Sequence, residues 1–138
     1  MIMILMVFIG SWTTIMVEDL ASNTSSYSAA QSNLYDSMTW FAQHTPRSSK
    51  LLSVTDWRIA FLIPITGRPA QLLFLAPGPD AVTYAKNNNY DYILVTYFIP
   101  ATVSPTIDLP GYYDSFNENQ SLTVVYQNAN DIIYQVLK

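Results

Sequence analysis

Apolar residues recur at a helical spacing in one early segment of this chain. Four of them share one face of a predicted helix: Leu34, Met38, Phe41 and Ala42. The sequence Ser28–Gln31 (SAAQ) fits a capping box at the start of this helix. Pro46 ends it, because a proline keeps the preceding Thr45 out of the helical region. The pattern therefore predicts one amphipathic helix between these two signals.

Short apolar runs bounded by turn residues predict strands in the rest of the chain. Three such runs are Lys50–Thr55, Gln71–Leu75 and Asp91–Phe98. The second is expected to be a buried strand, and the third is rich in β-branched and aromatic residues, as in a strand covered on both faces. The end of the chain reads as a β-hairpin of Leu122–Gln127 and Asp131–Leu137, joined by Asn-Ala-Asn.

Helices and loops are predicted between these strands. An Ala-Pro-Gly-Pro-Asp turn leads into a short helix at Ala81–Lys86, and Tyr112–Asn117 is expected to form a helical turn. The proline-containing segment Pro100–Pro110 is predicted to be irregular. The rhythm of strands and helices indicates an α/β fold: a three-layer domain with a small mixed, mainly parallel sheet and a C-terminal β-hairpin.

The first 17 residues carry no charge, and the first nine are all apolar. At a rise of about 1.5 Å per residue they make roughly 25 Å of helix, close to the thickness of a bilayer core. We expect residues 1–20 to be a transmembrane helix, residues 21–28 a Ser-rich linker and residues 29–138 one domain. A truncated span of this kind predicts that the chain is the tail of a larger membrane protein. A signal peptide and a buried helix are the alternatives for this segment.

Two sequons and the charge pattern predict that the domain is extracytoplasmic, at the cell membrane. Asn23 and Asn119 begin N-glycosylation sequons, and Glu18 and Asp19 follow the expected span, with no Lys or Arg before Arg47. The net charge is −4 and the pI about 4.5, which argues against a nucleic-acid partner. With no cysteine and a single histidine, His44, the chain offers no thiolate or histidine metal cluster, and His44 is expected at the C-terminus of the first helix.

The candidate binding residues follow the first predicted strand. Asp56, Trp57 and Arg58 come directly after it, and ligands of α/β sheets bind outside the carboxyl ends of strands. The alternative is that Asp56 caps the next segment and pairs with Arg58. Four basic residues fall close together in sequence and either face lipid phosphates or form solvated charges: Arg47, Lys50, Arg58 and Arg68.

A second group of candidate residues surrounds a Pro-Gly-Tyr-Tyr loop. Asp108, Asp114 and Glu118 suit either a hard-cation or sugar site or a solvated loop. The rings of Tyr112 and Tyr113 are candidates to stack on a sugar or to fill the core. No motif for a nucleophile or a phosphate-binding loop is present, so no catalytic residue is predicted.

Several blocks together resemble a known family. Residues 40–46 (WFAQHTP), a strand, then 56–58 (DWR) and 67–69 (GRP) are similar to the C-terminal extracytoplasmic domain of C-type membrane glycosyltransferases, related to the oligosaccharyltransferase catalytic subunit. The closing hairpin, with 124–128 (VVYQN) and 133–136 (IYQV), resembles the "vYeN…IYkV" ending of such proteins. The resemblance covers about the whole chain.

The resemblance implies a supporting role next to a membrane active site. The family motif WWDYG, which helps to recognise the acceptor sequon, corresponds to Val54–Arg58 (VTDWR) here, where Asp56 matches and both tryptophans and the glycine do not. Sequon recognition is therefore not carried over. The catalytic carboxylates and any divalent metal of this family lie in loops between earlier membrane spans, so no cofactor is expected in this chain. The expected partners are membrane lipid and a lipid-linked sugar or acceptor polypeptide, contacted by Asp56, Trp57, Arg58 and Arg68. The alternative is a membrane-anchored binding or structural module with no transferase role.

Overall fold

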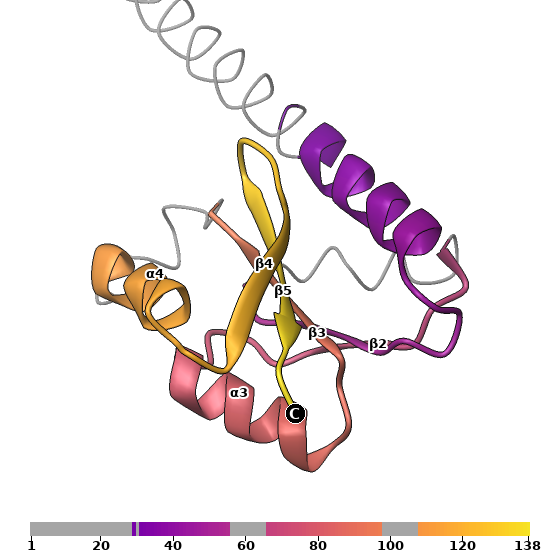
Figure 1. The fold of residues 1–138 in the computed structure, drawn as a ribbon. Coiled ribbons are helices and arrows are strands. Elements are labelled where there is room, and N and C mark those ends of the chain that lie inside the picture. Colours follow the sequence, from indigo (N-terminus) through magenta and orange to yellow (C-terminus); the bar gives the residue numbers. More distant parts are fainter. Residues whose placement is uncertain (1–28, 30, 56–65, 98–107) are drawn as a thin grey trace, which may run out of the picture. The chain divides into compact units, whose positions relative to one another are not determined.

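The computed structural model describes residues 29, 31–55, 66–97 and 108–138, drawn in colour in Figure 1. The chain divides into two units, Met1–Ser32 and Asn33–Lys138. Of the first unit only residues 29, 31 and 32 are described, so the predicted span at residues 1–20 and the linker lie outside the described residues. In the part of the chain that is described, no helix is both long enough and apolar enough to cross a bilayer.

The second unit is built on an open mixed sheet of five described strands. They are β1 (Leu51–Ser53), β2 (Ala70–Leu72), β3 (Tyr92–Thr96), β4 (Leu122–Gln127) and β5 (Asp131–Val136), in the order β2-β1-β3-β5-β4. The pairs β1–β2 and β1–β3 are parallel, and the pairs β3–β5 and β4–β5 are antiparallel. The sheet is therefore mixed, as predicted, with two parallel and two antiparallel strand pairs, because the C-terminal hairpin pairs through β5 with the central strand β3.

The first described helix spans residues 31–44 and is called helix 31–44 below. Leu34, Met38 and Phe41 are buried on one face of it, which confirms the prediction from their spacing. The helix ends at His44, as expected, where the hydroxyl of Thr45 donates to the carbonyl of Phe41 at 2.6 Å, and Pro46 follows. The predicted capping serine, Ser28, lies outside the described residues.

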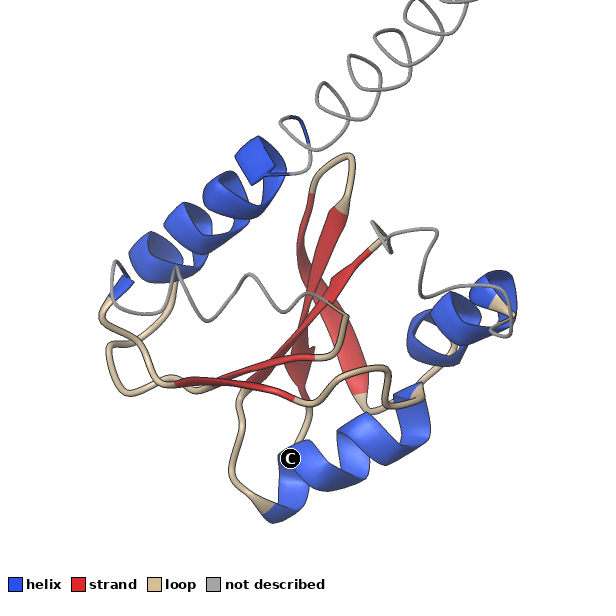
Figure 2. Ribbon diagram, turned by 180° about the vertical axis from the view of Figure 1, so that it is seen from behind, coloured by secondary structure: helices blue, strands red, loops and turns tan. Residues whose placement is uncertain are grey.

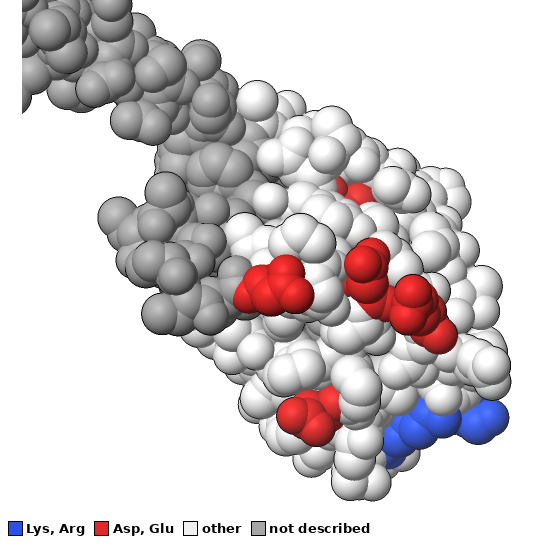
Figure 3. Space-filling model, turned by 90° about the vertical axis from the view of Figure 1, so that its left-hand side faces the viewer, with Lys and Arg blue, Asp and Glu red and all other residues white. Residues whose placement is uncertain are grey.

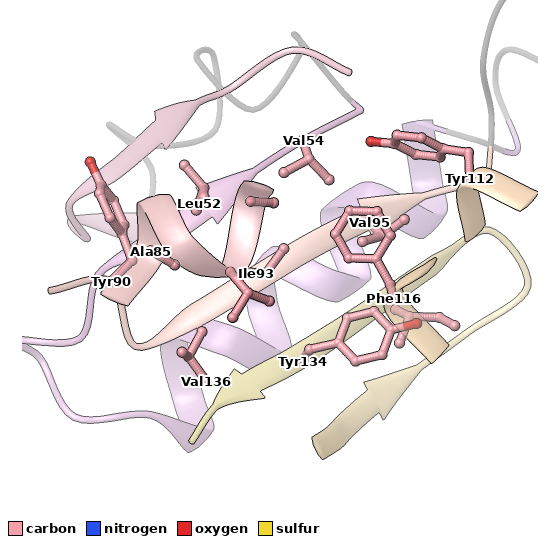
Figure 4. Close-up of a cluster of buried hydrophobic side chains, with 13 residues drawn as sticks. Leu52, Val54, Ala85, Tyr90, Ile93, Val95, Tyr112, Phe116, Tyr134 and Val136 are labelled. Atoms are coloured by element: carbon pink, nitrogen blue, oxygen red, sulfur yellow. The ribbon is translucent and has the colours of Figure 1, made fainter. Parts of the chain in front are cut away.

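Helix α3 (Gly78–Asn87) and helix α4 (Leu109–Asn117) cover one face of the sheet. Their buried residues pack with alternate residues of β1, β3 and β5 into the larger core cluster, part of which is shown in Figure 4. In this cluster Phe116 of α4 stacks on Tyr134 of β5, with ring centroids 6.2 Å apart. Ile93 and Val95 point to this side from β3, and both are fully buried.

Helix 31–44 covers the opposite face. Its apolar residues pack against Leu51, Leu94 and Ile133 in a second core cluster. Trp40 extends the contact to the outermost strand β4, because its ring stacks on that of Tyr126 with a centroid distance of 5.0 Å. Since β3 contributes to both clusters, the prediction that it is covered on both faces is confirmed, and the domain has three layers (Figures 1 and 2).

Two elements differ from the sequence prediction. A strand is present where Gln71–Leu75 was predicted, but the prediction that it is buried is wrong. β2 begins at Ala70, ends at Leu72 and is the outermost of the described strands, and Gln71 and Phe74 are exposed. Helix α4 starts three residues before the predicted turn, since Asp108 accepts from the backbone N–H of Gly111 at 3.4 Å and Pro110 suits a first helical turn. Pro110 is therefore helical rather than part of an irregular loop.

The remaining predicted elements agree with the structure or lie outside it. Helix α3 contains the predicted segment Ala81–Lys86 and is longer at both ends. The C-terminal hairpin is confirmed, and its second strand ends one residue before the predicted Leu137. The segments 56–65 and 98–107 lie outside the described residues, and with them most of the predicted irregular loop.

The sheet has two ends with different chemistry. The carboxyl edge is where β1, β3 and β4 end and β5 begins, because Thr96 pairs with Asp131 and Gln127 pairs with Ile132. The amino edge is the opposite end. In Figure 1 the hairpin turn and the start of helix 31–44 lie at the carboxyl edge, at the top, and the C-terminus lies at the amino edge, at the bottom.

Candidate functional site

A fully buried carboxylate lies at the carboxyl edge, where β3, β5 and helix 31–44 meet. Asp131, the first residue of β5, accepts hydrogen bonds from the hydroxyls of Ser37 at 2.7 Å and Thr96 at 2.6 Å. The backbone N–H of Thr96 donates to the hydroxyl oxygen of Thr55 at 2.5 Å, which ties the end of β1 to the end of β3. Together with Asn128, which donates to Ser37 at 3.0 Å, these residues form what we call the carboxyl-edge cluster.

The hairpin turn holds the cluster to the first helix. The side-chain oxygen of Asn128 accepts from the backbone N–H groups of Asn130 at 2.9 Å and Asp131 at 2.8 Å, the local bonding that favours asparagine in turns. The side-chain nitrogen of Asn128 donates to the carbonyl of Asn33 at 2.9 Å, and the side chain of Asn33 donates to that of Asn130 at 3.0 Å. The start of helix 31–44 is thereby fixed against the turn between β4 and β5.

Two tyrosines lie beside the cluster. Tyr97 follows β3 directly and is 37% exposed, and its ring lies 4.1 Å from that of Tyr113 on α4, measured between centroids. The hydroxyl of Tyr113 donates to the carbonyl of Thr96 at 3.4 Å. Burial, and then the neighbouring Tyr97, raises the pKa of Tyr113 to about 12, so this phenol is neutral at physiological pH.

Tyr112 has a different environment from Tyr113. It is buried in the larger core cluster, where its ring contacts Phe116 edge to face. Burial raises its pKa, as expected for a phenol removed from water. The two tyrosines predicted as a pair that stacks on a sugar therefore divide, since Tyr112 fills core and Tyr113 reaches the carboxyl edge.

The candidate residues Asp56, Trp57 and Arg58 lie outside the described residues. The structure does describe Thr55, the residue that precedes them, and places it buried in the carboxyl-edge cluster. The chain thus passes from this cluster directly into the three residues that the sequence singles out.

Arg68, the fourth predicted binding residue, lies at the amino edge. It is 6% exposed, and its Nη2 donates to the carbonyls of Ala42 at 2.6 Å and Thr45 at 2.8 Å, at the C-terminus of helix 31–44. These carbonyls have no partner within the helix, so the guanidinium caps it. The structure therefore does not bring Arg68 together with Thr55, where the other three candidates begin.

All the basic residues that the structure describes lie toward the amino edge. Lys50 and Arg68 come just before β1 and β2, Lys86 is in the last turn of α3, Lys138 follows β5, and Arg47 follows helix 31–44. Figure 3 shows basic side chains gathered at one end of the face that it displays, with acidic side chains elsewhere on it. Lys50 donates to the carbonyl of Asn88 at 2.8 Å and Lys138 pairs with Asp91 at 3.1 Å, so part of this charge is used within the domain.

The acidic residues around α4 are exposed. Asp108 caps the helix, while Asp114 and Glu118 lie on it and at its end. Within the described ranges, no three His, Cys, Asp or Glu side chains are grouped so that they would hold a metal ion. The solvated alternative is the one that agrees with this exposure.

Two other predicted residues have local roles in the structure. Asn119 lies in the partly exposed turn between α4 and β4, where its side-chain oxygen accepts from the backbone N–H of Ser121 at 3.0 Å. Its companion sequon residue Asn23 lies outside the described residues. His44 is exposed, and its ring stacks on Trp40, one turn earlier in the helix, at 5.1 Å.

The carboxyl-edge cluster itself was not predicted from the sequence. Ser37 and Asp131 stand 94 positions apart, and nothing in their spacing predicts that they meet. One signal was present: Asp131 opens a strand that is otherwise almost entirely apolar, directly after an asparagine-rich turn. No known family model matches the chain, and no curated protein matches it either.

Proposed function

We propose that residues 29–138 form the extracytoplasmic domain of a membrane glycosyltransferase-like protein, anchored by a transmembrane helix in residues 1–20. In this proposal the domain has no catalytic residue and helps to form the site for the acceptor or the lipid-linked donor. One observation carries it: the chain enters the compact unit at the same end of the sheet where α/β domains bind ligands.

The place where the chain enters is defined by Asn33, the first residue of the compact unit. Its carbonyl and side chain are hydrogen-bonded to Asn128 and Asn130 in the hairpin turn at the carboxyl edge. Whatever precedes Asn33 is therefore attached at the carboxyl edge. In this proposal, a membrane anchor in that preceding segment would be tethered to the domain at this edge.

The length of the linker limits how far the edge lies from the membrane. Residues 21–28 reach at most roughly 28 Å when fully extended, at about 3.3–3.6 Å per residue, and residues 29–32, which precede Asn33, add to this reach. The phosphate of a lipid-linked sugar lies at the headgroup level. Such a tether would keep the carboxyl edge within reach of a donor held in the same membrane.

In this proposal the carboxyl-edge cluster positions the strand ends, and the residues that follow Thr55 contact the ligand. The hydrogen bonds of Ser37, Thr96 and Asp131 are made within the domain, so these residues position the strand ends rather than contact a ligand. We assign ligand contacts to Asp56, Trp57 and Arg58, which continue the chain from Thr55. An arginine suits a phosphate, an aromatic ring suits the apolar face of a sugar, and a carboxylate accepts from sugar hydroxyls. Arg68 is left out, because its described hydrogen bonds cap a helix at the other end of the sheet.

Binding of a lipid-linked sugar tests this function. The probe is a radiolabelled sugar on a polyprenyl phosphate, offered to the full chain in phosphatidylcholine nanodiscs. Arg58→Ala removes the proposed phosphate contact and is expected to raise Kd about tenfold, while Arg47→Ala, an exposed arginine after helix 31–44, changes it less than about twofold.

Two results would contradict the proposal in different ways. Equal weakening by Arg58→Ala and Arg47→Ala would mean that general charge attraction, and not a site at the carboxyl edge, binds the probe. No binding by the unaltered chain would favour the alternative, a membrane-anchored binding or structural module with no transferase role.

A further inference from the structure

The two outermost described strands of the sheet, β2 and β4, differ in how their outer sides are protected from pairing with another strand. An edge strand presents unpaired backbone N–H and C=O groups, and proteins block this surface with short strands, prolines, charges or bulges. We infer that β4 pairs edge to edge, in antiparallel orientation, with β4 of a second copy of this chain. This inference concerns a surface that the proposed function does not use, and it stands independently of that function.

The edge at β2 is well protected. The strand has only three residues, and Pro69 precedes it and cannot donate a hydrogen bond. Beyond the strand, Leu75 has a φ of 56°, which breaks the extended backbone. A partner strand would find almost no continuous backbone to pair with here.

The edge at β4 is much less protected. The strand has six residues, Leu-Thr-Val-Val-Tyr-Gln, with no charge and no proline, and most of them favour β structure. It is the last of the described strands in the sheet order, so its outer side has no neighbour among them. Val124 is 49% exposed on it. The one protective feature is a bulge between Val124 and Tyr126.

The lack of charge on β4 favours a second copy over a different partner. In a twofold-symmetric pair of identical antiparallel strands, each residue meets the same short stretch of its own sequence. Any charged residue near the axis would then face a like charge, which destabilises a strand pair. The chain as a whole carries a net charge of −4, yet β4 has none. A charged strand of a different partner would find no opposite charge on β4 to pair with.

The exposed valine indicates where the axis lies. With the twofold axis near Val124, the two Val124 side chains would pack on each other and lose their exposure to water, which is favourable for apolar surface. The two sheets would then continue into one another across the axis. This arrangement brings the two copies of residue 124 to a Cα separation of about 4.5–5.5 Å.

Disulfide trapping tests this arrangement, because the chain has no native cysteine. Val124→Cys in the full chain, in mild detergent and under mild oxidation, is expected to form mostly covalent dimer, since Cα atoms about 4.4–6.8 Å apart can be bridged. Phe74→Cys is the matched control, because Phe74 follows β2 and is 48% exposed, nearly the same as Val124. The control is expected to stay monomeric.

A second variant separates pairing through β4 from other association. Val124→Lys places like charges on the axis and is expected to halve the particle mass measured by light scattering, whereas Phe74→Lys leaves it unchanged. Circular dichroism checks that both variants fold. The inference is overturned if the two cysteine variants cross-link equally, if neither does, if Val124→Lys leaves the mass unchanged, or if Val124→Cys links to a different protein instead of its own copy.

Discussion

Two buried polar side chains in this domain, Asp131 and Arg68, form hydrogen bonds with groups that lie far from them in the sequence. The carboxylate of Asp131 accepts from two hydroxyls, and the guanidinium of Arg68 donates to two carbonyls at the end of helix 31–44. Burying a charge is costly unless such bonds are made, so both residues are fixed by their surroundings. The sequence placed Arg68 among the same candidate binding residues as Asp56–Arg58. In the structure Arg68 stabilises the end of a helix, whereas Thr55, which precedes Asp56, belongs to the carboxyl-edge cluster.

The raised pKa of Tyr113 makes stability depend on alkaline pH. An unfolded tyrosine ionises near pH 10, whereas folded Tyr113 stays neutral until about pH 12, so the folded state binds more protons between these values. The free energy of unfolding is therefore expected to fall as the pH rises from about 10 to 12. Tyr113→Phe removes this contribution and should make the fall less steep, as measured by urea denaturation of the full chain in non-ionic detergent at a series of pH values. An unchanged slope would show that Tyr113 does not titrate as stated.

At the scale of elements, α3 and α4 pack together through a glycine. The backbone N–H of Gly78 donates to the hydroxyl of Ser115 at 2.9 Å, and a Cβ at Gly78 would collide with the backbone carbonyl of Ser115. The start of α3 thus approaches α4 more closely than any larger residue permits. Because Phe116, the next residue of α4, packs on β5, this contact also holds α4 against the sheet.

Gly78→Ala is expected to destabilise the domain by about 1–3 kcal/mol, since overpacking forces the two helices apart. Thr83→Ala serves as the control, because Thr83 is exposed on the same helix, and it should change the free energy of unfolding by less than about 0.5 kcal/mol. Urea denaturation of the two variants gives the comparison. Equal stability of the two variants would mean that α3 and α4 do not meet at Gly78.

For the molecule as a whole, the sequence predicted the elements that bury a regular apolar pattern. Helix 31–44, the central strand β3 and the closing hairpin all follow from spacing or from turn residues, and each is confirmed. Position within the sheet was harder to predict. The run around Gln71 is apolar enough for a buried strand, yet it is the outermost of the described strands. Its hydrophobic pattern does not specify its place in the strand order.

The candidate site was predicted only in part. The rule that ligands bind at carboxyl ends of strands pointed to the segment after β1, and the structure adds that Thr55 lies in a buried polar cluster there. The cluster itself depends on contacts between Ser37, Thr96 and Asp131, which are far apart in the sequence. Strand β5 runs antiparallel to β3, and this pairing brings Asp131 next to Thr96 at the end of β3. The pairing is seen in the structure and could not be read from the sequence.

The proposed function expects the carboxyl edge, where the chain enters the domain, to lie nearer the bilayer than the amino edge, and distances from the bilayer test this expectation. A single spin label is attached at Ala129→Cys, in the hairpin turn, or at Asn87→Cys, at the end of α3 near the amino edge; both native residues are exposed and the chain has no other cysteine. The full chain is reconstituted in vesicles whose headgroups chelate nickel, which speeds the relaxation of nearby labels. We expect clearly faster relaxation at position 129 than at position 87. Equal relaxation at the two positions, or faster relaxation at position 87, would contradict it.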